Sequence, residues 1–259
     1  MIDRQLFSHP LEETAFNDVT KTVNFKDLLE DQYIHFEEKK RWPDLLGKTV
    51  KVSEKQFPEV FALSRKIEQK TKITMPDLFV YEDIYYAIDS KGIDTPWIEV
   101  SASMLTDFTY KELEFMLARE ICRIHYKHTH YHTLMNESIE MYSKGIPFTN
   151  GVVEEVARVN FYRWNRLANY SADCFGYLIG MDLQAATQSI LKCVLNSEYL
   201  AKHINLAEYL KQAEAINELH DPVYEATKSD EQFPYGPFRI KNLIAYASSE
   251  RAMQAINQI

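Results

Sequence analysis

The most chemically distinctive pattern in this 259-residue sequence is the run Arg119-Glu120-Ile121-Cys122-Arg123. Apolar residues recur around the run at helical spacing, and at about 100° per residue Glu120 falls in the middle of the apolar stripe. A carboxylate on a buried face is costly unless it is paired. The run therefore predicts that another group compensates the charge of Glu120.

A second pattern follows directly along the chain. His125, His128 and His132 are spaced i, i+3 and i+7, so their imidazoles share one face if the helix continues that far. Imidazole is a good metal ligand, and one interpretation of this face is a metal site. The alternative is a solvated, histidine-rich helix end, where cations are favoured near a C-terminus.

Two helices must position these side chains. The first begins at Thr109, where the sequence Thr-Tyr-Lys-Glu forms a capping box. The second is predicted from about residue 153 to residue 180. Its polar residues Arg166, Asn169 and Asp173 are spaced i, i+3 and i+7 and so share one face. The sequence therefore predicts two long helices, each with a polar group on an otherwise apolar surface.

Shorter elements surround these two helices. Short helices are expected within residues 1–50, a loop through 145–147, and further helices at 53–72, 182–196, 206–219 and 239–256. Strands are predicted at 75–81, 85–88 and 97–101, with a turn into another short strand at 46–52 and a turn at 89–92. The pattern predicts a mostly helical α+β fold with a small antiparallel sheet beside the first long helix.

Composition and charge restrict the function further. The formal net charge is −9 with no basic block, so binding to nucleic acid is not expected. No apolar stretch approaches 18 residues, so no membrane span is expected, and the N-terminus lacks the apolar segment of a signal peptide. Three cysteines without a short-spaced pair favour reduced thiols and a cytoplasmic location.

The order of these parts resembles the HtpX/CAAX-prenyl-protease family of gluzincin metallopeptidases. The family pattern E-L-x-x-x-x-A-H-E-x-x-H-x-x-x-x-H is matched at Glu112, Leu113, Ala118, Glu120 and His128. The pattern W-x-R-x-x-E-x-x-A-D-x-x-G is matched at Trp164, Arg166, Ala172, Asp173 and Gly176. A late segment of the family is matched at Pro234, Arg239 and Leu243. The resemblance spans about residues 45–250 and implies a metallopeptidase-like domain at 46–259 with an N-terminal helical extension at 1–45.

The sequence departs from the family where the family holds its zinc. In the family, two histidines and a glutamate bind the ion, water completes the tetrahedron, and the glutamate of the H-E pair is the general base. Here Arg119 and Arg123 stand at the histidine positions and Asn169 at the glutamate position, whereas Glu120 is retained. Arginine is not deprotonated in a protein and offers no lone pair, so no zinc or other cofactor is expected at these positions.

The replacements imply that the positions of the family's zinc site have a structural role in this chain. Arg119 and Arg123 are expected to place positive charge where the ion stood and to pair with Glu120 and Asp173. The family-matched residues Arg166, His128 and Arg239 are the further charge partners that the resemblance places around the site.

Three functions remain open at this point. The leading one is a catalytically inactive homologue, a pseudopeptidase, that binds a peptide or partner protein through the retained cleft beside the edge strand. The alternative is an active hydrolase that uses a relocated metal at His125, His128 and His132, or Glu120 without zinc. The third is a purely structural subunit of a complex.

Overall fold

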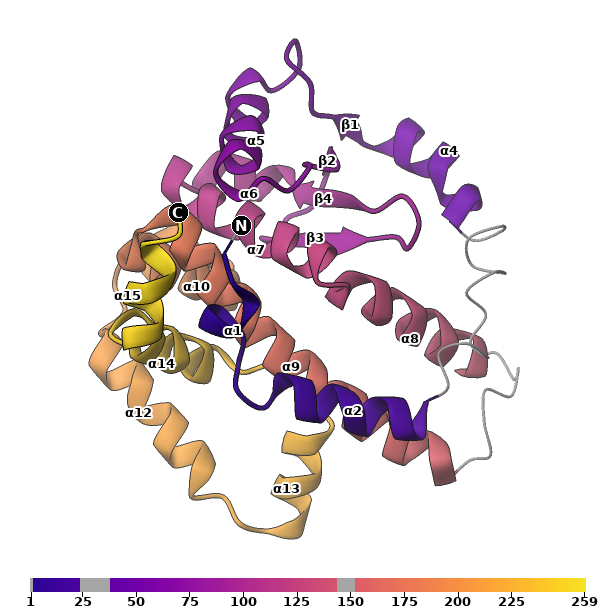
Figure 1. The fold of residues 1–259 in the computed structure, drawn as a ribbon, viewed down its shortest axis with the longest axis vertical. Helices are drawn as coiled ribbons and strands as arrows, with labels where there is room; N and C mark the ends of the chain where they lie inside the picture. Colours follow the sequence, from indigo (N-terminus) through magenta and orange to yellow (C-terminus); the bar gives the residue numbers. More distant parts are fainter. Residues whose placement is uncertain (1, 24–37, 144–151) are drawn as a thin grey trace.

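The computed structural model describes residues 2–23, 38–143 and 152–259, and most of them are helical (Figure 1). The N-terminal part contains α1 (Arg4–Phe7), α2 (Glu12–Thr22), α4 (Lys39–Lys48), α5 (Pro58–Thr71) and α6 (Ala102–Asp107). The long central helices are α7 (Tyr110–His125), α8 (His128–Ser143) and α9 (Val152–Gly180). The C-terminal part contains α10 (Leu183–Leu195), α11 (Glu198–Ala201), α12 (Leu206–Asn217), α13 (Pro222–Ser229), α14 (Gly236–Ala247) and α15 (Glu250–Ile256).

The sheet is small and mixed. Its strands are β1 (Val50–Lys51), β2 (Asp77–Tyr81), β3 (Ile88–Lys91) and β4 (Trp97–Ser101), in the order β1-β2-β4-β3. β2 and β4 are parallel, with Leu78 opposite Ile98, whereas β1 and β3 pair antiparallel at the two edges. The α+β class is therefore observed, but the prediction of an antiparallel sheet was wrong. The central strands β2 and β4 are short and mostly apolar, and such sequences do not show whether the two strands run parallel or antiparallel.

Three predicted boundaries also differ from the structure. The strand predicted at 85–88 and the turn at 89–92 are replaced by β3 at Ile88–Lys91, because Tyr86 is bonded through its backbone N–H to Asn196 and not to a neighbouring strand. The closing helix predicted at 239–256 is two helices. Ser249 caps the second by accepting a hydrogen bond from Ala252 N–H, which ends the first helix before it.

The condition for a shared histidine face, one helix continuing through His132, is not met. α7 stops at His125, and α8 begins anew at His128. Lys127 between them has φ of +63°, a left-handed conformation that no α-helix contains. The loop predicted at 145–147 lies outside the described residues.

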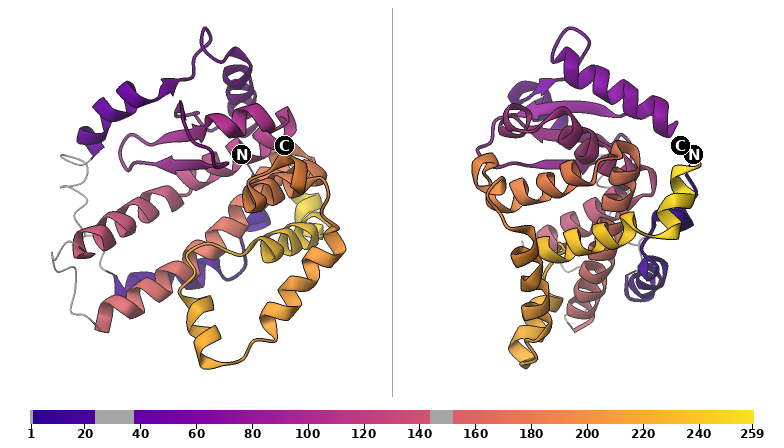
Figure 2. Two further views of the ribbon diagram at one scale, coloured as in Figure 1. Left: turned by 180° about the vertical axis from the view of Figure 1, so that it is seen from behind. Right: turned by 90° about the vertical axis from the view of Figure 1, so that its left-hand side faces the viewer.

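The central helices form the frame of the molecule. α7 packs on α9, while β3 contacts both α7 and α8. Figure 2 shows the sheet and α5 at one end of the molecule and the α12–α13 pair at the other. Along the described residues, no helix combines the length and apolarity that a membrane crossing requires.

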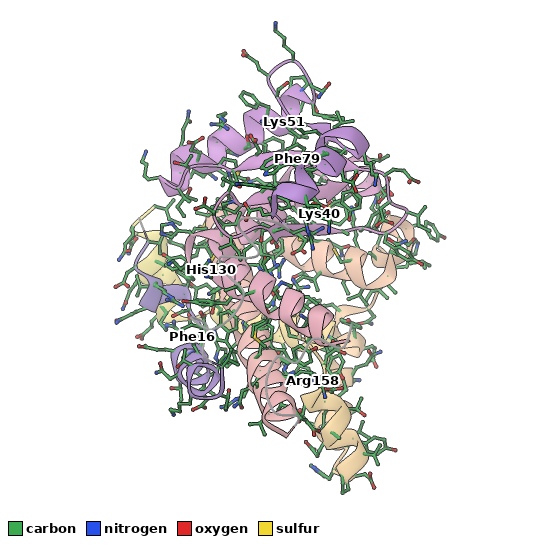
Figure 3. The ribbon with its side chains drawn as sticks, turned by 90° about the vertical axis from the view of Figure 1, so that its right-hand side faces the viewer. Phe16, Lys40, Lys51, Phe79, His130 and Arg158 are labelled. Carbon is green, nitrogen blue, oxygen red and sulfur yellow. The ribbon has the colours of Figure 1, made fainter. Side chains whose placement is uncertain are left out.

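The described N-terminal residues pack onto this frame. α2 lies along α9, and its residues Ala15 and Val19 are buried with Phe161 and Trp164. The ring of Phe16 lies 5.3 Å from that of Trp164, and Figure 3 shows Phe16 on α2, where the helix faces the rest of the molecule. Residues 24–37 of the predicted extension lie outside the described residues, so the predicted domain boundary at 45/46 stays a prediction.

Candidate functional site

Two local features of the sequence fix the start of α7 and its close approach to α9. The capping box predicted at the start of α7 is present, with Thr109 Oγ1 accepting from Glu112 N–H and Glu112 accepting from Thr109 N–H. Gly176 of α9 lies against Phe115 of α7, where a Cβ atom would come within 2.8 Å of the Phe115 carbonyl oxygen. The glycine therefore permits the close approach that brings the polar faces of both helices together.

Arg119 lies at the centre of the site and is buried. Its Nε is 2.6 Å from Asp173 Oδ1, and its Nη1 is 2.7 Å from Glu120 Oε1. Its Nη2 donates to the amide oxygen of Asn169, which is oriented by the bond from Asn169 Nδ2 to the carbonyl oxygen of Asn165. The contact expected between Asp173 and an arginine of the first helix is therefore present.

Glu120 is completely buried and accepts hydrogen bonds on both oxygens. Oε1 accepts from Arg119. Oε2 accepts from Arg123 Nη1 at 3.1 Å, from Ser90 Oγ at 2.7 Å and from Ser90 N–H at 3.1 Å. The Ser90 hydroxyl is in turn 2.6 Å from the hydroxyl of Thr129. The carboxylate thus accepts four hydrogen bonds and has no contact with solvent.

Two further arginines complete the cluster. Arg239 of α14 forms a bidentate pair with Asp173, with Nε 2.9 Å from Oδ2 and Nη2 2.8 Å from Oδ1. Arg123 also reaches Asp89 of β3, at 3.2 Å between Nη1 and Oδ1. Its Nη2 is buried and has no hydrogen-bond partner among the described residues.

The charges in the cluster balance. Its members are three guanidinium groups and three carboxylates, contributed by Arg119, Arg123, Arg239, Glu120, Asp173 and Asp89. We name these six residues the ionic cluster. Burial alone would raise the pKa of Asp173, but its two arginine partners outweigh burial and hold that pKa below the ordinary value. Burial would lower the pKa of Arg123, and its carboxylate partners raise it instead, so both groups are charged.

Arg166 and His128 lie outside the ionic cluster. Arg166 donates to the backbone carbonyl of Glu231 and so fixes the segment that precedes α14. The Nε2 of His128 is 2.8 Å from Glu12 Oε1, and Glu12 also accepts from Ser171 Oγ. In a catalytic triad the histidine lies between the serine and the carboxylate and takes the proton of the serine. Here the Glu12 carboxylate lies between His128 and Ser171, so this group is not arranged to activate a serine nucleophile.

The three histidines of the predicted metal face have separate surroundings. His125 is exposed at the end of α7, whereas His128 is buried against Glu12. His132 is buried with Gln232 Nε2 3.1 Å from its Nε2, and burial followed by the charge of Arg123 lowers its pKa to about 3. Within the described part of the chain, no group of three or more His, Cys, Asp or Glu side chains is arranged to hold a metal ion.

The residues at the family's zinc positions do not fit a zinc ion. Arg119 and Arg123 offer only N–H donors, and the oxygen of Asn169 is already bonded to Arg119. No chemical step can therefore be assigned to zinc at these positions.

The edge of β3 is partly closed by the same cluster. The carbonyl oxygen of Ala87 accepts a hydrogen bond from Ser101 N–H of β4. Because hydrogen-bonded residues alternate along an antiparallel pair, the backbone N–H and C=O groups of Ile88 and Ser90 face away from β4. The N–H of Ser90 is occupied by Glu120. Among the described residues, no side chain caps the N–H of Ile88. Of the outward-facing N–H groups of Ile88 and Ser90, Glu120 therefore occupies that of Ser90.

Sequence reasoning did not find Ser90, Thr129, Asp89 or Glu12. Each reaches its partner from a different element and across a long stretch of chain, so helical spacing gives no signal for it. A buried carboxylate at Glu120 indicates that donors are needed, but not which loop or strand supplies them.

Comparisons with known proteins give one similar structure. No family model matches the sequence, and no curated protein matches it. A solved structure titled crystal structure of S. mikatae Ste24p is similar at 14% identity, with a TM-score of 0.39. The match covers 70% of this chain and 49% of that chain, so this chain spans about half the length of the structure it matches. A likeness at this score does not establish a shared activity, and none is assigned from it.

Proposed function

We propose that this chain is a metallopeptidase-like pseudopeptidase, in which an ionic cluster has replaced the zinc and which acts by binding a peptide or partner protein. The observation that carries the proposal is the set of contacts of Arg119. Its guanidinium meets Glu120, Asn169 and Asp173, which the resemblance assigns to the general base, the third zinc ligand and the supporting aspartate. Under this proposal the Arg119 guanidinium, a cation fixed by covalent bonds, takes the place that the resemblance assigns to the metal.

The state of Glu120 also supports a role without hydrolysis. A general base must reach a water molecule or a substrate proton with a free lone pair. Glu120 is buried and accepts from Arg119, Arg123 and Ser90. The alternative of an active hydrolase, with a metal at the three histidines or with Glu120 alone, is less well supported, because the histidines have separate surroundings and Glu120 is buried.

Rebuilding the three ligands tests the proposal. The triple variant Arg119→His, Arg123→His, Asn169→Glu restores two imidazoles and a carboxylate beside Glu120. It leaves one guanidinium, Arg239, against four carboxylates, so a divalent cation would offset part of the excess negative charge. We expect this variant to take up zinc in proportion to protein and to gain thermal stability with zinc.

A variant without imidazoles and the unmodified protein serve as controls for zinc uptake. The variant Arg119→Gln, Arg123→Gln, Asn169→Glu has the same charge without imidazoles and is expected to take up far less zinc. The unmodified protein, freed of any affinity tag and dialysed, is expected to carry well under one zinc per chain by elemental analysis. Stoichiometric zinc in the unmodified protein, or a folded triple variant without zinc, would refute the proposal.

A further inference from the structure

Large exposed apolar side chains lie on two segments that meet next to the start of β3. They are Ile84 and Tyr85 before β3, and Tyr199 and Leu200 in α11. Their relative exposures are 71%, 61%, 70% and 49%. Exposed side chains of this size in neighbouring segments are typical of interaction sites. We name these four residues the apolar platform.

Hydrogen bonds join the two segments of the platform. The Asn196 side chain accepts from Tyr86 N–H at 2.7 Å and donates to the Ile84 carbonyl at 3.0 Å. The Tyr86 hydroxyl accepts from Glu198 N–H at 3.3 Å. Asn196 itself has φ of +48°, a left-handed conformation that asparagine tolerates and that ends α10. The loop before β3 and the start of α11 are therefore held as one unit.

The backbone around Tyr85 is fully engaged. Its N–H donates to Asp83 Oδ1 at 2.9 Å, and its carbonyl accepts from Ser103 Oγ at 3.0 Å. The loop is thus fixed by hydrogen bonds while the side chains of Ile84 and Tyr85 face solvent. A binding surface that is already ordered loses little conformational entropy on association, which favours aromatic and aliphatic anchors of this kind.

The charges beside the platform indicate the kind of partner. Residues 82–86 and 196–203 contain three acidic residues, Glu82, Asp83 and Glu198, and one lysine, Lys202. Glu198 pairs with Lys202 and also with Lys192 of α10, so the uncompensated carboxylates of these three are those of Glu82 and Asp83. In the described residues, Glu82 and Asp83 form no ion pair. A second copy of this chain docked about a twofold axis would bring these carboxylates toward each other, which is unfavourable.

We propose that the apolar platform binds a segment of a partner protein that carries apolar side chains flanked by lysine or arginine. This rests on the binding role under the proposed function and names the partner's chemistry and the surface it uses. The platform contains none of the residues of the ionic cluster, so zinc uptake and partner binding are tested by separate variants.

A defined probe tests this proposal. The probe is a short fluorescent peptide of alternating leucine and lysine, compared with the same peptide in which glutamate replaces lysine. Fluorescence anisotropy at physiological salt is expected to give tighter binding of the lysine peptide. The variant Ile84→Ala, Tyr85→Ala is expected to weaken that binding by about tenfold or more, as for truncation of an interface anchor. Glu82→Lys is expected to weaken it and to reduce its dependence on salt.

The matched control is Val223→Ala, Tyr224→Ala, which removes two exposed apolar side chains of α13. This variant is expected to bind the lysine peptide as the unmodified protein does. Equal binding of the two peptides, or equal weakening by the control, would overturn the proposal. Concentration-dependent dimerisation that is lost in the Ile84→Ala, Tyr85→Ala variant would assign the platform to a second copy and overturn it too. Failure of zinc uptake by the triple variant would refute the pseudopeptidase and leave the peptide result unchanged.

Discussion

At the scale of single residues, the site depends on the shape of the arginine side chain. A guanidinium is planar, stays charged and presents donors in several fixed directions, whereas an ammonium is a point charge. Arg119 uses Nε, Nη1 and Nη2 toward three different partners on two helices. Lysine at this position would keep the charge but could not hold all three partners in place.

Loss of the Glu120 charge is expected to destabilise the protein. In Glu120→Gln, the amide group would face an N–H donor in either orientation, because both carboxylate oxygens accept from nitrogen donors. Breaking a buried pair by removing one partner costs about 3–5 kcal/mol. We expect a loss of this size in the free energy of unfolding, measured by urea denaturation.

The control for this change is Glu208→Gln. Glu208 pairs with Lys211 at 2.7 Å, but both side chains are exposed. A surface pair contributes about 0–1 kcal/mol, so this variant is expected to unfold almost as the unmodified protein does. A Glu120→Gln protein of normal stability would show that Glu120 is not a structural charge partner.

Glu12 is expected to make stability depend on acid pH. Burial would raise the pKa of Glu12, but His128, Ser171 and Arg4 outweigh it and lower the pKa from 4.5 to about 2. Because the folded pKa is depressed, the stabilisation is present above pH 4.5 and is lost as the pH falls toward 2. The shift corresponds to about 3 kcal/mol, from 1.36 kcal/mol for each pKa unit.

Unfolding measured between pH 7 and pH 2 tests this expectation. Glu12→Gln is expected to be less stable than the unmodified protein at pH 7, and the difference is expected to shrink below pH 4.5. Glu13→Gln is the control, because Glu13 is an exposed neighbour on the same helix. A constant difference across this pH range would argue against a depressed pKa at Glu12.

Residues of the site were predictable from the sequence only where helical spacing relates them. The stripe around Glu120 and the shared face of Asn169 and Asp173 follow from 3.6 residues per turn, and the resemblance supplied the pairing between the two helices. Ser90 and Asp89 bond to the first helix from a strand, and no local pattern fixes that contact.

At the scale of elements, the site depends on how closely α7 and α9 approach. In Gly176→Ala, the added methyl group would lie 2.8 Å from the Phe115 carbonyl oxygen and 3.0 Å from its ring. Overpacking of this kind costs about 1–3 kcal/mol, against a gain of about 1 kcal/mol in helix propensity. We expect a net fall in thermal stability, measured by circular dichroism.

Gly47→Ala provides the control for the helix propensity. Gly47 lies within α4, and no atom would lie within 4 Å of an added Cβ. This variant is expected to be as stable as the unmodified protein or slightly more so. If Gly176→Ala behaves in the same way, the close approach of the two helices at this residue does not limit stability.

Helices were easier to predict than the sheet. The capping box and long apolar periodicity located α7 and α9 almost to the residue, whereas the break between α7 and α8 depends on one left-handed residue, Lys127. β4 runs parallel to β2 because β3 lies at the outer edge of the sheet and not between them. The sequences of such short strands do not determine this order.

At the scale of the whole molecule, the N-terminal residues contribute to both large apolar clusters. Ile2 and Phe7 are buried in the cluster around the sheet and α7, and Ala15 and Val19 in the cluster between α2, α8 and α9. Glu12 adds a buried polar link from α2 to His128 of α8 and Ser171 of α9. These contacts tie the start of the chain to the helices that carry the ionic cluster.

The neutrality of the ionic cluster also restricts how this sequence can change over generations. Replacing Arg119 alone with neutral histidine would leave Arg123 and Arg239 against three carboxylates, of which Glu120 and Asp173 are fully buried, and this excess of negative charge is unfavourable. The same holds for Arg123. Each single substitution of an arginine in the cluster is therefore expected to give a less stable protein. The effects of the substitutions are expected to be strongly non-additive, because neighbours in one charged network do not act independently. A sequence that contains this cluster is therefore held in it by epistasis among its charged residues.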